Sequence, residues 1–165
     1  MELLISLLQK SFSQNTQMLN SLAKKFEGED VFFRPYQLVN HLAWQIGHLT
    51  FVRNTIIKII QKDMILNLLP LEKENFMPGT PLPNNQAFPS IEEMLKAFDE
   101  RGQTITVLLE NIDSEKWHSE SPFKIPIGNT IGEQIWGFLA HENRHLGEIC
   151  YLKNIMVRNK ENTQN

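Results

Sequence analysis

Two histidines, His141 and His145, stand four residues apart and offer the clearest chemistry in the chain. In a helix, positions four apart lie on one face, about 40° apart around the axis, so both imidazoles can reach one metal ion. Phe138 and Leu152 share this face, which predicts that it points into the protein interior. Buried imidazole nitrogens need polar partners, and a metal ion would supply one. The alternative is a histidine pair bonded only to neighbouring side chains.

A third ligand would have to come from elsewhere in the chain. His48 lies in a second apolar segment beside Gly47. A glycine costs about 1 kcal/mol relative to alanine inside a helix, so it indicates the close approach of another segment or a ligand. Catalytic zinc sites commonly have three protein ligands, and nickel, cobalt and iron also accept imidazole. Spacing alone leaves the third ligand open among His41, His48 and His118.

Several further residues could support or line such a site. Glu148 and Gln134 share the face of the histidine pair, so they are candidates for orienting the imidazoles through hydrogen bonds. Glu142 lies about 100° around the helix from His141, which makes it a weaker candidate for a base. Aromatic side chains could form the wall of a pocket, although at this spacing they also fit an ordinary core: Trp44, Phe51 and Phe138.

Four segments with helical periodicity must position these side chains, and they are predicted at residues 2–26, 35–61, 90–112 and 130–158. Gly28 ends the first pattern, and Pro35 suits the start of the second helix because its missing N–H would have no partner there. Capping boxes, in which a side chain and a backbone N–H bond reciprocally, open the last two helices at Ser90 and Thr130. Residues 63–89 and 113–129 are predicted to be irregular.

The predicted fold is therefore all-α: a four-helix bundle with long connections between helices 2 and 3 and between helices 3 and 4. The chain of 165 residues has no internal repeat, which predicts a single domain over residues 1–165. A long connection in a compact domain is often functional. The polar residues 158–165 are expected to form a disordered tail.

Composition excludes several classes of function. A formal net charge of -3, from 16 Lys+Arg and 19 Asp+Glu, argues against a nucleic-acid-binding protein, which would carry a basic face. One cysteine, Cys150, rules out an internal disulfide and a cysteine-based zinc ribbon, and it fits a cytoplasmic protein. No apolar run has the length of a membrane span, and the N-terminus lacks the basic stretch of a signal peptide.

A competing motif overlaps the histidine pair. Residues 141–145 read His-Glu-Asn-Arg-His and fit H-E-x-x-H, the zincin protease signature, in which the glutamate is the general base. A zincin needs a third ligand well downstream, but only 20 residues follow His145, with Glu148 one turn away and Glu161 in the tail. A di-iron site would need inward-facing glutamates, and the helix of His48 contains none. Both are minor alternatives.

Two motifs, in this order and at this separation, resemble the DinB-like family, which includes proteins of the bacillithiol-transferase type. They are Trp-x-x-Gly-His at residues 44–48 and His-x-x-x-His-x-Gly-x-Ile at residues 141–149. The helix start at Thr130 also looks like that of the family. Members of the family often have histidine at the position of Arg144. The resemblance covers nearly the whole chain. It implies a four-helix bundle with a divalent metal ion, zinc or nickel, held by three ligands: His48, His141 and His145.

The resemblance also implies an activity. Family members of known activity transfer a low-molecular-weight thiol or isomerise with a thiol cofactor. The expected function is therefore thiol S-transfer to an electrophilic small molecule at the metal site. A metal-dependent hydrolase and a non-catalytic, metal-binding stress-response module are the alternatives. A structural site would be closed by a fourth protein ligand, for which His41 is the nearest candidate.

A bacterial source and a homodimer are further implications of the resemblance. The second predicted helix carries an apolar cluster that cannot all face one core, since consecutive helical positions are about 100° apart. Either a second subunit or the 63–89 connection must cover this cluster, which consists of Ile56, Ile57, Ile59 and Ile60. A symmetric dimer would bury the same patch on both subunits.

Overall fold

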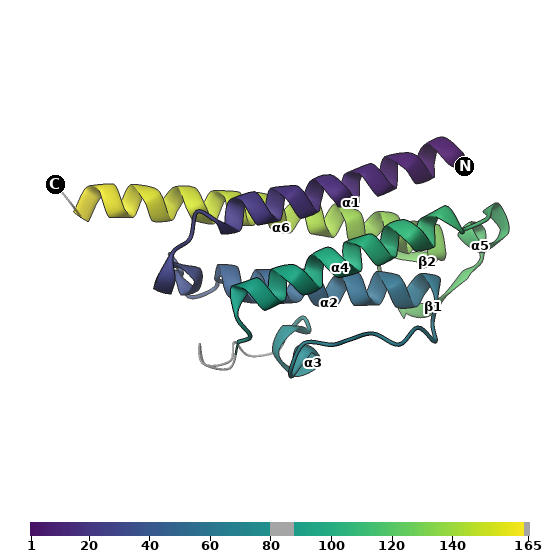
Figure 1. The fold of residues 1–165 in the computed structure, drawn as a ribbon, viewed down its shortest axis with the longest axis horizontal. Helices are drawn as coiled ribbons and strands as arrows, with labels where there is room; N and C mark the ends of the chain where they lie inside the picture. Colours follow the sequence, from purple (N-terminus) through teal and green to yellow (C-terminus); the bar gives the residue numbers. More distant parts are fainter. Residues whose placement is uncertain (80–87, 164–165) are drawn as a thin grey trace.

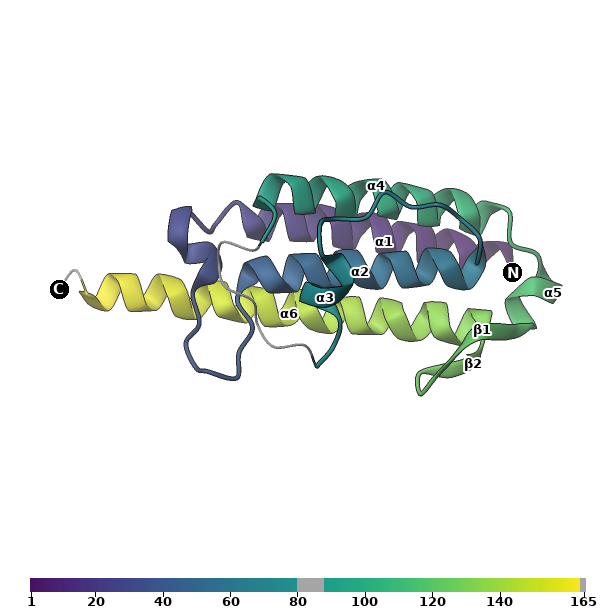
Figure 2. The ribbon, with the colours of Figure 1, turned by 90° about the horizontal axis from the view of Figure 1, so that it is seen from below.

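The computed structural model describes residues 1–79 and 88–163. Four long helices lie side by side: α1 (Glu2–Ala23), α2 (Leu42–Ile60), α4 (Ile91–Glu110) and α6 (Ile131–Thr163) (Figures 1 and 2). Between them lie the 3-10 helix η1 (Gly28–Phe32), α3 (Glu72–Phe76), α5 (Ser114–His118) and the antiparallel strands β1 (Glu120–Ile125) and β2 (Gly128–Thr130). The predicted all-α four-helix bundle is confirmed. In the described residues, no helix is long and apolar enough to cross a membrane.

The helices form a ring around the core, since α2 packs against α4 and α6, and α1 packs against the same two helices. The core consists of two apolar clusters along the bundle axis, one that includes Leu19, Leu49 and Leu146 and one that includes Phe12 and Ile135. A buried polar layer separates them. This layer contains the buried ion pair of Arg53 and Glu142. The candidate site includes His48, which lies in the half of α2 that is nearer its first residue, Leu42.

The start of α2 differs from the prediction. The helix begins at Leu42 rather than at Pro35, and His41 is its N-cap residue. The backbone N–H of Trp44 donates a hydrogen bond to Nδ1 of His41 at 3.1 Å. The imidazole of His41 packs edge-on against the rings of Phe32 and Phe88. Histidine is not among the preferred N-cap residues, so no strong capping signal marks this helix start.

The capping boxes predicted at Ser90 and Thr130 are both present. Ser90 Oγ accepts from the Glu93 N–H at 3.2 Å, and the Glu93 carboxylate accepts from the Ser90 N–H at 2.9 Å. Glu133 and Thr130 make the corresponding pair, with distances of 3.0 and 3.2 Å. Local side-chain chemistry therefore fixes where α4 and α6 begin. The start of α6 in turn fixes which face of that helix carries His141 and His145.

Both long connections contain structure that the sequence did not predict. The 63–89 connection includes α3, and its residues 80–87 lie outside the described residues. The 113–129 connection, predicted to be irregular, contains α5 and the hairpin. Pro122 lies within β1 and Pro126 in the turn that follows. Because proline is uncommon in strands, these two residues favoured the prediction of an irregular segment. Proline is tolerated in β1 because a two-stranded sheet leaves each strand one edge without pairing.

Two expectations about the ends and faces of the helices also need correction. Residues 158–163 belong to helix α6, so the prediction of a disordered tail is wrong for these residues. Within this stretch, Lys160 forms an ion pair with Asp30 of η1 at 2.5 Å. Residues 164–165 lie outside the described residues.

The four isoleucines of the α2 cluster are all buried within the single chain, where Met64 and Leu66 help to cover them. They give no support for a second subunit, and the homodimer stays a prediction.

Candidate metal centre

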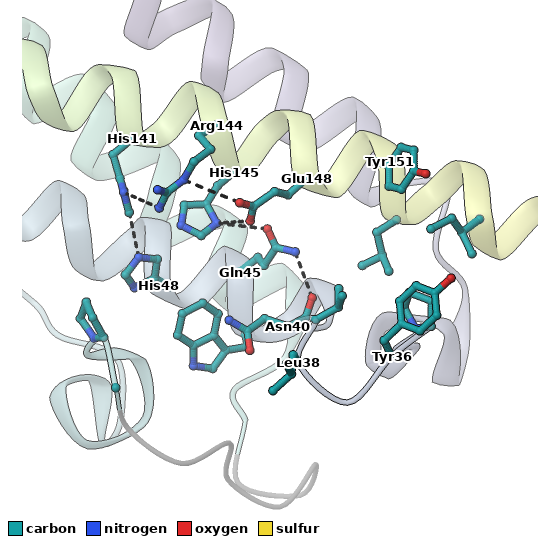
Figure 3. A pocket seen from close by; sticks show the side chains of 17 residues that line it. Tyr36, Leu38, Asn40, Gln45, His48, His141, Arg144, His145, Glu148 and Tyr151 are labelled. Carbon is teal, nitrogen blue, oxygen red and sulfur yellow. Dashed lines mark hydrogen bonds and ion pairs between the residues drawn. The ribbon is translucent and has the colours of Figure 1, made fainter.

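The three histidines named by the family resemblance come together where α2 faces α6 (Figure 3). His48, His141 and His145 each offer one ring nitrogen as a possible ligand, and these three nitrogens all lie within 4.8 Å of one another. Nε2 of His48 and Nε2 of His141 are 2.9 Å apart. Within residues 1–79 and 88–163, these three are the only cluster of His, Cys, Asp or Glu with such spacing.

Oxygen acceptors hold the second ring nitrogen of two of these histidines. His48 donates from Nδ1 to the Phe76 carbonyl at 2.8 Å. His145 donates from Nδ1 to Gln45 Oε1 at 3.2 Å and to Glu148 Oε2 at 3.1 Å. Because these oxygens only accept, the proton of each neutral ring sits on Nδ1, and Nε2 keeps its lone pair. Proteins orient metal-binding histidines in this way.

The carbonyl that orients His48 comes from α3, and Gly47 makes room for that helix. A Cβ atom at Gly47 would lie only 2.2 Å from the ring of Phe76. The Trp44 indole N–H donates to the Asn75 carbonyl at 3.1 Å, and its ring stacks on the imidazole of His48 with centroids 4.7 Å apart. The last turn of α3 therefore fixes both the position and the tautomer of His48.

The other end of α3 is anchored by Glu72, whose carboxylate is buried. Arg101 of α4 donates to Glu72 Oε2 at 2.8 Å, and the Leu69 backbone N–H donates to the same oxygen at 2.9 Å. The Asn54 side chain of α2 donates to Oε1 of Glu72. These bonds tie the short helix to α2 and α4, so the Phe76 carbonyl is held rigidly against His48.

A cavity of about 610 Å³ borders the three histidines. Beside them its wall is polar, with Gln45, Arg144 and Glu148 (Figure 3). Farther along it becomes more apolar, with Tyr36, Leu38, Val39, Tyr151 and Ile155 among the lining residues. Arg144 and Glu148 are the charged side chains among the described lining residues, and Arg144 Nε lies 3.6 Å from Glu148 Oε1.

The comparison with known families agrees with this geometry. A model of the DinB superfamily matches residues 11–149, which is most of the chain and includes all three histidines. The chain belongs to the DinB superfamily. A search of the curated proteins gave no match. The family predicted from the motifs at residues 44–48 and 141–149 is thus confirmed.

Two predicted supporting residues have other roles in this DinB-superfamily chain. Gln134 holds the hairpin, because its Nε2 donates to the carbonyls of Phe123 and Gly128 at 2.8 Å each. It lies two helical turns before His141, too far along α6 to reach the imidazoles. Glu142 is fully buried and forms an ion pair with Arg53, so it cannot act as the base of the zincin motif. Both predictions of a role at the site are corrected.

Of the remaining aromatic and histidine candidates, some lie at the cavity and others do not. Trp44 lines the cavity, whereas Phe51 and Phe138 are not among its described lining residues and pack against the apolar clusters. His41 belongs to the helix cap and is not part of the three-histidine cluster. His118 lies in α5, where its Nδ1 is 2.7 Å from the Ser114 carbonyl.

Sequence reasoning missed several groups that position the site. Gln45 and the Phe76 carbonyl orient imidazoles, but neither residue type stands out in a sequence. Arg53 carried a usable signal, because it is the first charged residue in the otherwise apolar and neutral start of α2. A lone charge on a buried helix requires a buried partner. That partner is Glu142, the residue that the protease motif assigned to catalysis.

Burial keeps the site histidines neutral at ordinary pH. The pKa of His141 is lowered to about 4 and that of His145 to about 3, chiefly by burial and in smaller part by the nearby His48 and Arg144. Burial also lowers the pKa of His48, opposed by its bond to the Phe76 carbonyl. Neutral imidazoles are the form that binds metal, so the three rings are available as ligands over a wide pH range.

This donor set fits a divalent transition-metal ion. Neutral imidazoles suit both zinc and nickel. Two nitrogens bound tetrahedrally to zinc at about 2.0–2.1 Å lie roughly 3.4 Å from each other. The Nε2 atoms of His48 and His141, at 2.9 Å, are close to that spacing, and the third ligand atom lies within 4.8 Å. Small side-chain rotations would bring all three to one ion.

We expect the Gly47→Ala substitution to damage both the fold and metal binding. The new methyl group would force the Phe76 ring away and carry with it the carbonyl that orients His48. Overpacking of this kind costs about 1–3 kcal/mol of folding free energy, and loss of an orienting partner costs about 10–100-fold in metal affinity. Chemical denaturation and a chelator competition assay measure the two effects.

Gly147→Ala is the matched control, because no atom lies within 4 Å of a Cβ built at that glycine of α6. Alanine is the better helix former by about 1 kcal/mol, so this variant should be unchanged or slightly stabilised. Equal behaviour of the two variants would show that α3 does not position His48.

The metal-free protein should lose stability as the pH falls from about 6.5 to about 4. An unfolded histidine has a pKa of about 6.5, whereas the folded values of His41 and His141 are about 4 and that of His145 about 3. The unfolded chain therefore binds more protons across this window, and the free energy of unfolding decreases as protons are added. Urea titrations at a series of pH values measure this slope.

Bound metal should be retained at pH 6 and released toward pH 4, since protons compete for the imidazoles only near their lowered pKa values. His41→Asn keeps an N-cap residue but removes one titrating group, so it should make the stability slope shallower. A free energy of unfolding that stays constant between pH 7 and pH 4 would contradict the neutral, buried state of these histidines.

Proposed function

We propose that this protein is a metal-dependent enzyme whose divalent ion, zinc or nickel, is held by His48, His141 and His145. The observation that carries the proposal is the cavity of about 610 Å³ beside the cluster. His41, the candidate for a closing fourth ligand, caps α2 instead. Three ligands facing an open cavity are typical of catalytic sites, whereas structural sites are closed. This favours an enzyme over a non-catalytic metal-binding module.

We further propose that the reaction transfers a low-molecular-weight thiol to an electrophilic small molecule. The sulfur forms a bond to the electrophilic carbon, the bond to the leaving group breaks, and the leaving group takes that electron pair. The thiol proton passes to solvent in the cavity. A bound divalent ion would supply the activation, because it lowers the pKa of a thiol. Membership of the DinB superfamily supports this chemistry.

The residues of the chain have separate parts in this proposal. Gln45 and Glu148 hold the ring of His145, while α3 holds that of His48, so two of the three ligands are oriented before substrate arrives. The Trp44 ring forms one wall of the cavity next to the histidines. Rigid ligands and a preformed cavity fix the two reactants in one orientation, which lowers the entropic part of the barrier.

Metal analysis and a conjugation screen test the proposal. The protein, purified without nickel affinity resin, should contain about one zinc or nickel ion per chain. A panel of thiols is then offered with 1-chloro-2,4-dinitrobenzene, from which chloride leaves as the sulfur–carbon bond forms. We expect a rate with at least one thiol that a chelator abolishes, that His145→Ala lacks, and that His118→Ala retains.

The same preparations distinguish the alternatives. Stoichiometric metal without conjugation, but with chelator-sensitive cleavage of esters or amides, would indicate a hydrolase. Stoichiometric metal without either reaction would favour the non-catalytic module. A protein that binds no divalent metal would contradict the whole proposal.

A further inference from the structure

A continuous chain of hydrogen bonds links Arg144 to α3 through two of the histidines, and Figure 3 shows its first two links, from Arg144 to His141 and from His141 to His48. Arg144 Nη2 lies 3.1 Å from Nδ1 of His141, Nε2 of His141 lies 2.9 Å from Nε2 of His48, and His48 Nδ1 lies 2.8 Å from the Phe76 carbonyl. A guanidinium group only donates and a carbonyl only accepts, which fixes the direction of the chain. His141 accepts at Nδ1 and donates from Nε2.

This tautomer is not the one that binds a metal. A ligating neutral imidazole offers the lone pair of one nitrogen and carries its proton on the other. Nε2 of His141 faces the other ligands, so metal binding requires that its proton move to Nδ1. Arg144 would then meet an N–H group where it now meets a lone pair. Two donors cannot share a hydrogen bond, so Arg144 has to leave His141 when the site is loaded.

The released guanidinium lies in the cavity wall, next to the site. Arg144 and Glu148 are of opposite charge and the three imidazoles are neutral, so a loaded site would carry a net charge of about +2 from the ion alone. Arg144 lines the cavity, and its side chain is 63% exposed. The Nη2 donor released from His141 therefore becomes available to a ligand. Its natural partner is a carboxylate, which guanidinium binds in a paired, planar geometry.

The rest of the cavity indicates what such a carboxylate is attached to. Tyr36, Leu38 and Tyr151 line the part away from the histidines, and each is largely exposed, with Leu38 97% exposed. Exposed apolar and aromatic groups gathered around one cavity favour a ligand with an apolar body. The charge at one end and the apolar wall at the other complement a molecule that has both features.

We propose that Arg144 binds a carboxylate of the substrate, that this substrate has an apolar body, and that metal and carboxylate bind cooperatively. The proposal rests on the metal site of the proposed function. Loading the site removes the competing bond to His141, and the ion adds positive charge beside the guanidinium. Coupling between two ligands is reciprocal, so the carboxylate must strengthen metal binding by the same factor by which metal strengthens carboxylate binding.

Two probes of matched shape test this proposal: 4-phenylbutyrate and its uncharged amide. Calorimetric titration of the zinc-loaded protein should give the carboxylate at least about tenfold tighter binding than the amide. In metal-free protein, where Arg144 is still held by His141, the preference should shrink to about threefold or less. Arg144→Gln should lose the preference in the loaded protein, whereas Arg158→Gln, four turns farther along α6, should retain it.

Nitrogen-15 NMR of the histidine rings gives a second readout that does not depend on activity. Metal-free protein should show His141 protonated on Nε2 and His48 on Nδ1, and zinc should move the His141 proton to Nδ1. An unchanged preference in Arg144→Gln would overturn the inference, because the carboxylate would then bind the ion or another group. Zinc binding by the same sample, measured by atomic emission, would leave the proposed function standing, whereas a chain that binds no zinc would overturn both.

Discussion

The Glu142→Ala variant is expected to lose about 3–5 kcal/mol of folding free energy, the cost of breaking a buried ion pair by removing one partner. Both side chains of this pair are 0% exposed. Arg53 Nε donates to Glu142 Oε2 at 3.0 Å, and Nη2 donates to Oε1 at 2.7 Å. Without the carboxylate, the guanidinium charge would stay in the core without its counter-charge.

Arg53 cannot escape to solvent in this variant because it is bonded on every side. Besides Glu142 of α6, it donates to Thr16 Oγ1 and the Phe12 carbonyl of α1, and to the Phe98 carbonyl of α4, at 2.8–3.1 Å. Its guanidinium carbon also lies 3.4 Å from the centroid of the Phe98 ring. One side chain of α2 therefore joins all four helices, and the charge at its centre needs Glu142.

Urea denaturation of metal-free protein measures the effect. Glu100→Ala is the control, because its pair with Lys96 is exposed and such pairs contribute about 0–1 kcal/mol. Glu142→Gln keeps the shape and isolates the charge if the alanine variant does not fold. A protease base would behave in the opposite way, with activity lost and stability retained. Near wild-type stability of both Glu142 variants would contradict the structural role of the pair.

Patterns within one element predicted the local part of this structure well. The i, i+4 spacing placed His141 and His145 on one face, and the side-chain chemistry of Ser90 and Thr130 fixed two helix starts. The same local signals failed where a helix end depends on distant contacts. His41 caps α2 while its ring packs against Phe32 and Phe88. No motif in the neighbouring residues predicts this arrangement.

The supporting contacts of the site lay beyond such patterns because they join distant segments. Gln45 and His145 are 100 residues apart in sequence, and Arg53 and Glu142 are 89 apart. Helical periodicity says which residues share a face, but it does not say which faces meet or at what level along the bundle. The choice of His48 as the third histidine therefore came from the resemblance to the DinB-like family, and not from spacing.

The His48→Ala variant should lower metal affinity roughly 100-fold or more, since loss of even an orienting partner costs about 10–100-fold and His48 would be a direct ligand. The remaining two histidines both come from α6, one turn apart, and would leave the side of the ion toward α2 without a protein ligand. Among the described residues, no other group completes a cluster of three with them. Dialysis, metal analysis and chelator competition measure the change.

His118→Ala is the matched control, because His118 lies in α5 near the Ser114 carbonyl and outside the three-histidine cluster, so its metal content should equal that of wild type. The stability of metal-free His48→Ala must be measured as well. The Phe76 carbonyl would lose its donor, which costs about 1–3 kcal/mol for a buried group. A folded His48→Ala protein with full metal occupancy would exclude the three-histidine site, and would require that the ion bind through α6 alone.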